Sequence, residues 1–210
     1  MNKRNYQKEL DKVIEKMEGV KHLLMHSCCA PCSSYVLDYL SKHFQITVLY
    51  YNPNITASVE YFKRVEEQKR LIDIFNTQEG RYPIAWIEGD YQPSLFLDVT
   101  KGMEECPEGG ERCFLCYRMR LEESARIAKQ IGADYYSTTL TISPLKNAQK
   151  LNEIGEELAK VYGVDWLPSD FKKKEGYKRS VELSAEYGLY RQDYCGCAYS
   201  KAERERTKTD

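Results

Sequence analysis

Apolar residues recur along the chain with two different periods. Short apolar runs, rich in β-branched and aromatic residues, predict strands at residues 20–27, 46–54, 82–90, 133–143 and 164–168. Between these runs, apolar positions spaced by three or four residues predict helices at residues 34–44, 58–76 and 147–163, and the cysteine-bearing segment 106–131 is predicted to run into a helix. Strands and helices therefore alternate along most of the chain.

Two of the predicted helices carry an apolar face that we expect to be buried. In the helix at residues 58–76 this face consists of Phe62, Val65, Ile72 and Phe75. In the helix at residues 147–163 it consists of Leu151, Ile154, Leu158 and Val161. Glycines, which adopt left-handed backbone readily, are predicted to end two helices at Gly132 and Gly163.

This alternation predicts an α/β fold in which a parallel sheet is flanked by helices and joined by right-handed crossovers. Such sheets bind ligands at the carboxyl ends of their strands, near the point where the strand order reverses. We expect residues 1–210 to form a single domain. Residues 91–112, which contain several prolines and glycines, are predicted to form an excursion or lid, and residues 171–210 a C-terminal segment.

Charge and hydropathy narrow the class of protein. The formal net charge is −1, so any contact with nucleic acid must come from a local patch. No apolar run approaches the roughly 20 residues that a membrane span needs, and we expect no membrane partner. Residues 1–19 are predicted to form an amphipathic helix rather than a signal peptide, which indicates a cytoplasmic protein.

The eight cysteines fall into three groups. Clustered cysteines in a reducing compartment favour metal binding or redox catalysis over structural disulfides. The first group follows the first predicted strand, the second precedes a predicted helix, and the third lies near the C-terminus. The groups are Cys28, Cys29 and Cys32; Cys106, Cys113 and Cys116; and Cys195 and Cys197.

The Cys-x-x-Cys of Cys113 and Cys116 stands at the start of a predicted helix, whose N-terminus favours thiolates. Arg112, Arg118 and Arg120 add positive charge nearby. The motif alone is compatible with zinc, an iron–sulfur cluster or a dithiol. The adjacent pair of Cys28 and Cys29 favours a polynuclear cluster, because neighbouring thiolates can each bind a different metal corner. These four cysteines then form a ligand set for a [4Fe–4S] cluster, with zinc and a purely thiol site as alternatives.

The third group has the form Cys-Gly-Cys, at Cys195, Gly196 and Cys197. A disulfide between such close cysteines closes a small, strained ring, and strain makes the bond easy to reduce. The spacing therefore favours a switchable dithiol. Two further metal ligands, or two free thiols on a C-terminal segment, remain alternatives.

Five separated motifs, "HSCCAPCSS", "YYNPNI", "ERCFLCYRMRL", "TTLTISPLKN" and "YRQDYCGCAYS", occur in this order between about residues 20 and 200. Together they resemble the cobalamin-independent epoxyqueuosine reductase family, QueH. The resemblance implies a Rossmann-like fold similar to the adenine-nucleotide alpha-hydrolase superfamily. It also implies reduction of epoxyqueuosine to queuosine at the wobble position of tRNA, the last step of queuosine biosynthesis. The first loop lacks the glycines that hold phosphate in that superfamily, which argues against ATP use.

The resemblance also implies roles for individual cysteines. Cys28, Cys29, Cys113 and Cys116 match the ligands of a [4Fe–4S] cluster, and Cys195 and Cys197 match a pair that cycles through a redox-active disulfide. A second, mononuclear iron is implied near the cluster, and its candidate ligands in this sequence are Cys32, Cys106 and Asp193. The reaction consumes two electrons, so an external electron donor is an expected partner.

A tRNA substrate needs basic contacts, and one segment supplies a local basic patch made of Lys172, Lys173, Lys174, Lys178 and Arg179. A solvated helix face is the alternative interpretation of this charge run. Two other functions also remain open. One is an ATP-dependent tRNA-modifying enzyme of the same fold, and the other is a zinc-binding module that interacts with RNA.

Overall fold

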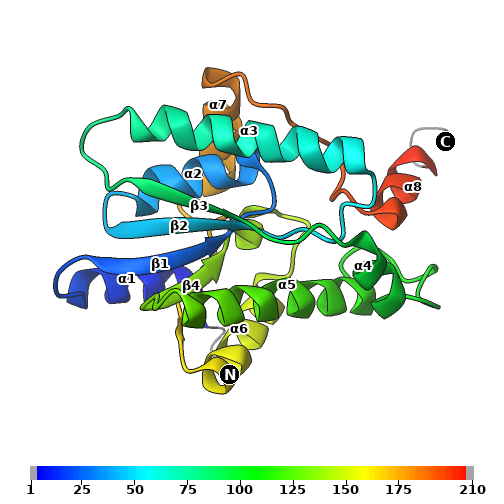
Figure 1. Ribbon diagram of the computed structural model, residues 1–210, viewed down its shortest axis with the longest axis horizontal. Helices are drawn as coiled ribbons and strands as arrows, with labels where there is room; N and C mark the ends of the chain where they lie inside the picture. The colour runs from blue at the N-terminus through cyan, green and yellow to red at the C-terminus, as the bar shows by residue number, and fades with distance from the viewer. Residues whose placement is uncertain (1–3, 207–210) are drawn as a thin grey trace.

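Within residues 4–206, the part of the chain that the computed structural model describes, five strands form one sheet (Figure 1). All neighbouring strands are parallel, in the order β3-β2-β1-β4-β5. The strands are β1 Lys21–His26, β2 Phe44–Tyr50, β3 Ile84–Glu88, β4 Tyr135–Thr138 and β5 Asp165–Trp166. The predicted α/β class is confirmed. The outermost parts of the predicted 1–210 domain, residues 1–3 and 207–210, lie outside the described residues.

The strand order reverses between β1 and β4, which pair directly. From β1 the chain moves outward to β2 and β3, then returns to β4 on the other side and continues to β5. Neighbouring crossovers therefore leave the sheet in opposite directions at this point. A crevice opens there at the carboxyl ends of the strands.

Helices cover both faces of the sheet because strand side chains alternate between them. On one face of the sheet, Leu23 and Met25 of β1 pack against α1 Tyr6–Lys16, α2 Ala30–Leu40 and α3 Ser58–Asn76. Leu24 faces the other way, against α5 Glu111–Gln130 and α6 Ala148–Tyr162. Helix α1 confirms the amphipathic helix predicted near the N-terminus.

The boundaries of several predicted elements were wrong, and two of these elements bear on the site. The strand predicted at residues 133–143 ends at Thr138, where its hydroxyl accepts a hydrogen bond from the Leu140 backbone N–H at 3.2 Å and begins the 3₁₀ turn η1, Thr139–Ile142. The second predicted helix starts at Ala30 rather than residue 34, because Pro31 fits the first turn of a helix. It ends at Leu40, and Phe44 already belongs to β2.

The predicted helix faces were correct except at one end of each. Val65, Ile72 and Phe75 are buried, whereas Phe62 is 54% exposed. Leu151, Ile154 and Leu158 are buried, whereas Val161 is 72% exposed. Gly132 and Gly163 both have positive φ angles at the ends of α5 and α6, as predicted.

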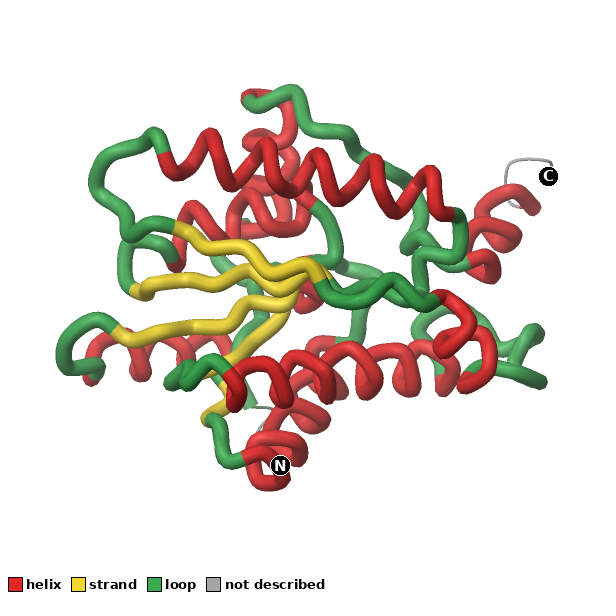
Figure 2. The backbone as a smooth tube through the Cα atoms, in the orientation of Figure 1, coloured by secondary structure: helices red, strands yellow, loops and turns green. Residues whose placement is uncertain are grey.

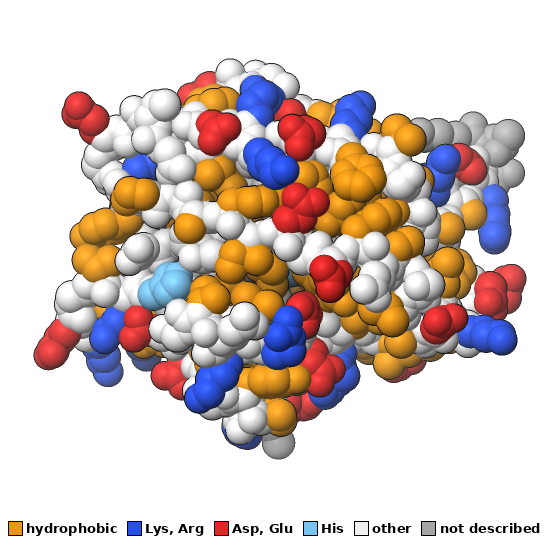
Figure 3. Space-filling view, in the orientation of Figure 1, with side chains coloured by type: hydrophobic (Ala, Val, Ile, Leu, Met, Phe, Trp, Pro, Cys, Tyr) orange, Lys and Arg blue, Asp and Glu red, His pale blue; other side chains and the backbone are white. Residues whose placement is uncertain are grey.

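Three further helices are α4 Pro93–Val99, α7 Gly176–Glu186 and α8 Ala198–Arg206. Figure 2 shows that α4, α8 and the loops around them gather at one end of the molecule. On the face drawn in Figure 3, acidic and basic side chains are intermixed, in keeping with the net charge of −1. No helix within residues 4–206 is long and apolar enough to cross a membrane.

Helix α6 approaches β5 closely at Gly155, and a substitution at this position tests how much the contact contributes to stability. A Cβ atom at this position would lie 2.2 Å from the buried ring of Trp166, and the Tyr136 hydroxyl already holds the Gly155 carbonyl at 2.6 Å. Gly155→Ala should therefore lower the free energy of unfolding by about 1–3 kcal/mol, despite the better helix propensity of alanine. Urea unfolding measures this change. Lys160→Ala, an exposed change in the same helix, is the control and should stay within about 0.5 kcal/mol of the parent chain.

Candidate metal and redox site

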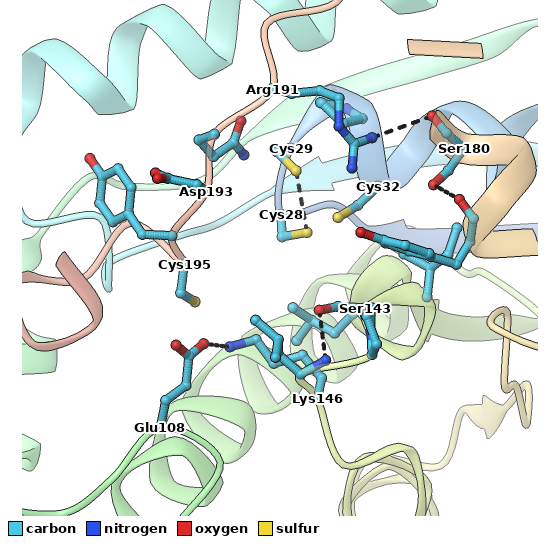
Figure 4. Close-up of a pocket in the computed structure, with 18 of the residues that line it drawn as sticks. Cys28, Cys29, Cys32, Glu108, Ser143, Lys146, Ser180, Arg191, Asp193 and Cys195 are labelled. Carbon is cyan, nitrogen blue, oxygen red and sulfur yellow. Dashed lines mark hydrogen bonds and ion pairs between the residues drawn. The ribbon is translucent and has the colours of Figure 1, made fainter. Parts of the chain in front are cut away.

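A cavity of about 380 Å³ opens at the carboxyl ends of β1 and β4. The loop after β1, the turn after β4 and the segment between α7 and α8 contribute its walls. Figure 4 shows the cysteines of the first loop facing the C-terminal segment across it. Its lining includes Cys28, Cys29, Cys32, Arg64, Glu108, Lys146, Tyr177, Arg191, Asp193, Tyr194 and Cys195.

The loop after β1 brings three sulfurs together. The Sγ atoms of Cys28, Cys29 and Cys32 all lie within 4.8 Å of one another, and those of Cys28 and Cys29 are 3.8 Å apart. Cys29 has an extended backbone as the N-cap of α2, and Pro31 follows in the first turn, so the chain passes from the loop into the helix directly after the two adjacent cysteines. The Thr139 hydroxyl of η1 lies 3.5 Å from the Cys28 sulfur and holds it from the β4 side.

The three thiols do not ionise equally. Hydrogen bonds from Cys29 and Cys32 lower the pKa of Cys28 well below its usual value. The same contact with Cys28 raises the pKa of Cys29 to about 12 and holds the pKa of Cys32 well above its usual value. The contacts within the group thus favour the anionic form at Cys28 over the anionic forms of Cys29 and Cys32. Thiolates are the form in which cysteine binds metals, so this loop is a suitable donor set for a soft metal or cluster.

A second, smaller cavity of about 20 Å³ adjoins the first. It is lined by Cys113 and Cys116 from the first turns of α5 and by Cys195 and Cys197 from the C-terminal segment. Cys195 lines both cavities. The two cavities therefore bring seven of the eight cysteines, from three distant segments, into one region at the edge of the sheet.

The start of α5 was expected to favour the thiolate forms of Cys113 and Cys116, but their surroundings in the protein favour the thiols. Burial raises the pKa of Cys116 to about 11. Burial also raises the pKa of Cys113, although the Gly109 backbone N–H donates to its sulfur at 3.3 Å and acts in the opposite direction. Desolvation outweighs the helix N-terminus here, so a bound cation or cluster is needed to stabilise these sulfurs as anions.

The Cys-Gly-Cys segment is held tightly in its unbridged form. Cys195 and Cys197 are free thiols, and the Ser200 backbone N–H donates to the Cys197 sulfur at 3.3 Å. Gly196 has a φ of +109°, and a Cβ there would lie 2.9 Å from Ile55 Cγ1. Cys197 is buried beside Cys116, whereas Cys195 is partly exposed at the larger cavity. The two cysteines of this pair thus have different surroundings.

Arg120, which is 1% exposed, lies next to these sulfurs. Its guanidinium donates to Asn52 Oδ1 at 2.5 Å and to His26 Nε2 at 3.3 Å, and it lies 3.9 Å from the Cys116 sulfur. None of the carboxylates in residues 4–206 forms an ion pair with it. A buried cation needs a nearby anion, and the groups within residues 4–206 that most raise the pKa of Arg120 are cysteine sulfurs. The site therefore fits a group of anionic thiolates, as in a metal or iron–sulfur centre.

The other two arginines that the sequence suggested as a source of positive charge have different roles. Arg118 points away from the site and pairs with Glu157 on the surface. Arg112 is buried and donates to the backbone carbonyls of Met103 and Glu104 at 2.8 and 3.1 Å. It therefore holds the 91–112 excursion against α5. Its positive charge is used for this contact as well as for the neighbouring sulfurs.

Several functional side chains were not singled out from the sequence. Lys146, which is buried, and Glu108, which is partly buried, form an ion pair of 2.9 Å that lines both cavities. Burial alone would lower the pKa of Lys146, but Cys195 and Glu108, among other groups, hold it well above its usual value. Arg64, also buried, donates to the Cys195 carbonyl at 3.2 Å. The only sequence signal for Lys146 was its position just after a predicted strand, within "SPLKN".

The remaining candidate residues are distributed differently. Asp193 and Cys32 line the larger cavity, whereas Cys106 lies on the loop before α5, outside both cavity linings. The basic residues occupy the turn before α7 and its first turns, and Tyr177 of this helix reaches the cavity. Most of them have acidic partners: Lys172 pairs with Asp170, Lys174 with Asp11, Lys178 with Glu175, and Arg179 with Glu182 and Glu186.

Comparison of the chain with known proteins shows its family. The sequence profile of the family described as "Epoxyqueuosine reductase QueH" matches residues 23–203. A protein of that name from Streptococcus pyogenes serotype M1 is 45% identical over 192 residues, which are 91% of this chain and 75% of the relative. Another from Staphylococcus epidermidis is 43% identical over 93% of this chain and 84% of the relative. A third from Thermotoga maritima is 36% identical over 87% of this chain and 91% of the relative.

Ile55 and Arg64 approach Gly196 closely, and this predicts that a side chain at position 196 destabilises the protein. Gly196→Ala places a side chain in left-handed backbone and against Ile55 and Arg64, so it should cost more stability than the backbone strain alone. We expect the free energy of unfolding to fall by about 2–4 kcal/mol in urea titrations. The control is Gly188→Ala, whose φ of +57° is also positive but which has open space around the new Cβ, and it should cost about 1 kcal/mol. Equal losses in the two variants would contradict the packing argument.

Proposed function

Because the chain belongs to the epoxyqueuosine reductase QueH family, we propose that it reduces epoxyqueuosine to queuosine at the wobble position of tRNA. One observation carries the proposal from the structure. Seven cysteines from three segments line two adjoining cavities at the reversal point of a parallel sheet, next to a buried arginine that has no carboxylate partner within residues 4–206. Such a centre suits electron transfer to a small polar group.

We propose Cys28, Cys29, Cys113 and Cys116 as the ligands of a [4Fe–4S] cluster. The contribution of such a cluster is to pass electrons one at a time to a bound substrate. Support comes from the vicinal thiolate and thiol of Cys28 and Cys29, from the adjoining cavities and from the positive charge of Arg120. For a second, mononuclear iron the candidates remain Cys32, Cys106 and Asp193. Of these, Cys32 and Asp193 line the larger cavity.

We propose Cys195 and Cys197 as the redox-active pair. Removing the oxygen of an epoxide as water, which leaves a carbon–carbon double bond, requires two electrons and two protons. Oxidising two thiols to one disulfide releases two electrons and two protons, so the pair balances one turnover. An external electron donor then reduces the disulfide for the next turnover. Cys195, which lines both cavities, is in a position to face the substrate.

The tRNA contact is proposed at α7 and the turn before it. Tyr177 places this helix at the cavity, so basic residues on it stand beside the path of a nucleotide that enters. Acidic partners neutralise part of the patch, as Lys172 and Lys174 show. Lys173 is exposed, and the exposed pair of Lys178 and Glu175 has a separation of 3.8 Å. These two lysines are therefore the members most able to bind phosphate.

The first test of the proposed function is the metal content of protein purified without oxygen. We expect about four or five irons and four acid-labile sulfides per chain, together with conversion of epoxyqueuosine in tRNA when a reductant is added. Cys113→Ser should lose both iron and turnover. The matched control is Leu115→Ser, an exposed position one residue before Cys116, which should retain them. One zinc per chain without sulfide would refute the electron-transfer proposal and favour a zinc-binding module.

A second test concerns tRNA binding. The double variant Lys173→Glu/Lys178→Glu should weaken tRNA binding about tenfold at moderate salt and flatten the slope of log affinity against log salt by about two. The control, Lys129→Glu/Lys160→Glu, has the same change in net charge at exposed positions near the C-terminal ends of α5 and α6. Binding titrations at several salt concentrations compare them. If both double variants bind alike, α7 is not the tRNA contact.

A further inference from the structure

The ion pair of Lys146 and Glu108 has a position that electron transfer alone does not explain. Both residues line the cavity of Cys28, Cys29 and Cys32 and the smaller cavity with Cys195. In Figure 4 the Cys195 side chain extends toward this ion pair from the C-terminal segment. A substrate in the larger cavity that reaches Cys195 therefore also reaches the ammonium of Lys146.

The Lys146 ammonium has hydrogen-bonding capacity to spare. An ammonium carries three N–H donors. Within residues 4–206, its Nζ atom makes one hydrogen bond, to Glu108 Oε1 at 2.9 Å, and its side chain is only 6% exposed. Donors that are buried without a partner are costly, so two remaining N–H groups beside a cavity favour a polar ligand atom there. An oxygen atom that gains negative charge is the partner that an ammonium stabilises best.

The other buried cation of the cavity is used differently. Arg64 pairs with Glu60 through Nη2 at 2.6 Å and donates through Nη1 to the Cys195 carbonyl at 3.2 Å. Its guanidinium thus fixes the backbone of the Cys-Gly-Cys segment. A guanidinium also cannot give up a proton in a protein, whereas an ammonium can.

We propose that Lys146 is a catalytic residue, which donates a hydrogen bond and then a proton to the epoxide oxygen as the first carbon–oxygen bond breaks. This inference rests on the proposed function and adds the proton source to it. The oxygen, which becomes an alkoxide when that bond breaks, is a stronger base than an amine, so the proton moves to it. Overall, one epoxide and two thiols give one alkene, one disulfide and one water.

The protons balance as follows. Lys146 gives one proton to the oxygen and regains it from the thiol of Cys195 as this sulfur is oxidised. The proton of the Cys197 thiol completes the water when the second carbon–oxygen bond breaks. Both electrons come from the two sulfurs, which end as a disulfide. No proton or electron is left over, and Lys146 returns to its ammonium form.

Glu108 is a positioning residue in this arrangement. Its Oε1 atom holds the Lys146 ammonium, and its Oε2 atom accepts a hydrogen bond from the Ser200 hydroxyl at 3.2 Å. The same hydroxyl accepts from the Cys195 backbone N–H at 3.0 Å. The proton donor and the reacting sulfur are thus fixed relative to one another through one carboxylate and one serine.

Lys146→Arg separates proton donation from charge. Arginine preserves the positive charge and the pairing with Glu108 but does not release a proton. We expect iron and sulfide content equal to that of the parent protein, a KM for epoxyqueuosine-containing tRNA within threefold, and a kcat at least a hundredfold lower. A kcat within threefold of the parent value would overturn proton donation by Lys146.

Chemical rescue gives an independent test. Lys146→Ala leaves space for a small amine beside the cavity. Added methylammonium or ethylammonium should therefore raise the kcat of this variant at least tenfold. Lys150→Ala, a change in the first turn of α6 at a residue outside both cavity linings, is the control, with parent activity and no response to amines. If the alanine variant retains its iron but amines restore nothing, the inference is overturned. If it loses its iron, Lys146 has a structural role and the inference is likewise overturned.

The same measurements separate this inference from the proposed function. Parent protein that contains iron and sulfide but converts no epoxyqueuosine would refute the proposed function itself. Parent protein that converts it, together with a fully active Lys146→Arg variant, would refute the role of Lys146 alone.

Discussion

The burial of positive charge beside sulfur is the constraint on which this site depends. Arg120 lies in the protein interior with an amide, an imidazole and a thiol as its neighbours rather than a carboxylate. An uncompensated buried guanidinium would cost several kcal/mol, on the order of what a whole domain gains on folding. Negative charge on the neighbouring sulfurs removes that cost. The arginine and the thiolates therefore stabilise each other, and neither arrangement is favourable alone.

The sheet brings these opposite charges together because its strand order reverses between β1 and β4. Cys28 leaves the end of β1, Thr139 leaves the end of β4, and the two meet through a hydrogen bond. The early end of β4 matters here. A strand that continued to residue 143 would carry Thr139 past Cys28 and extend the sheet into the cavity. The 3₁₀ turn instead folds back and leaves Lys146 at the wall.

Much of this arrangement could be predicted from the sequence, since apolar periodicity is a local signal. It predicted the five parallel strands, and spacing suggested Cys28, Cys29, Cys113 and Cys116 as one ligand set. Three-dimensional charge pairing could not be predicted in this way. Arg118 and Arg120 are two residues apart, yet one pairs with Glu157 on the surface and the other is buried beside the sulfurs. The thiol character of Cys116 was also missed, because it depends on burial by distant segments.

The basic patch is a second case in which charge pairing could not be predicted from the sequence. A run of lysines in sequence suggests a positive surface, but folding places Asp170 and Asp11 against Lys172 and Lys174. Buried positive charge lies around the cysteines instead, at Arg64, Arg112, Arg120 and Lys146. A buried charge acts more strongly than an exposed one because less water screens it. The electrostatic design of this protein is therefore concentrated around the cysteines rather than at the run of basic residues on the surface.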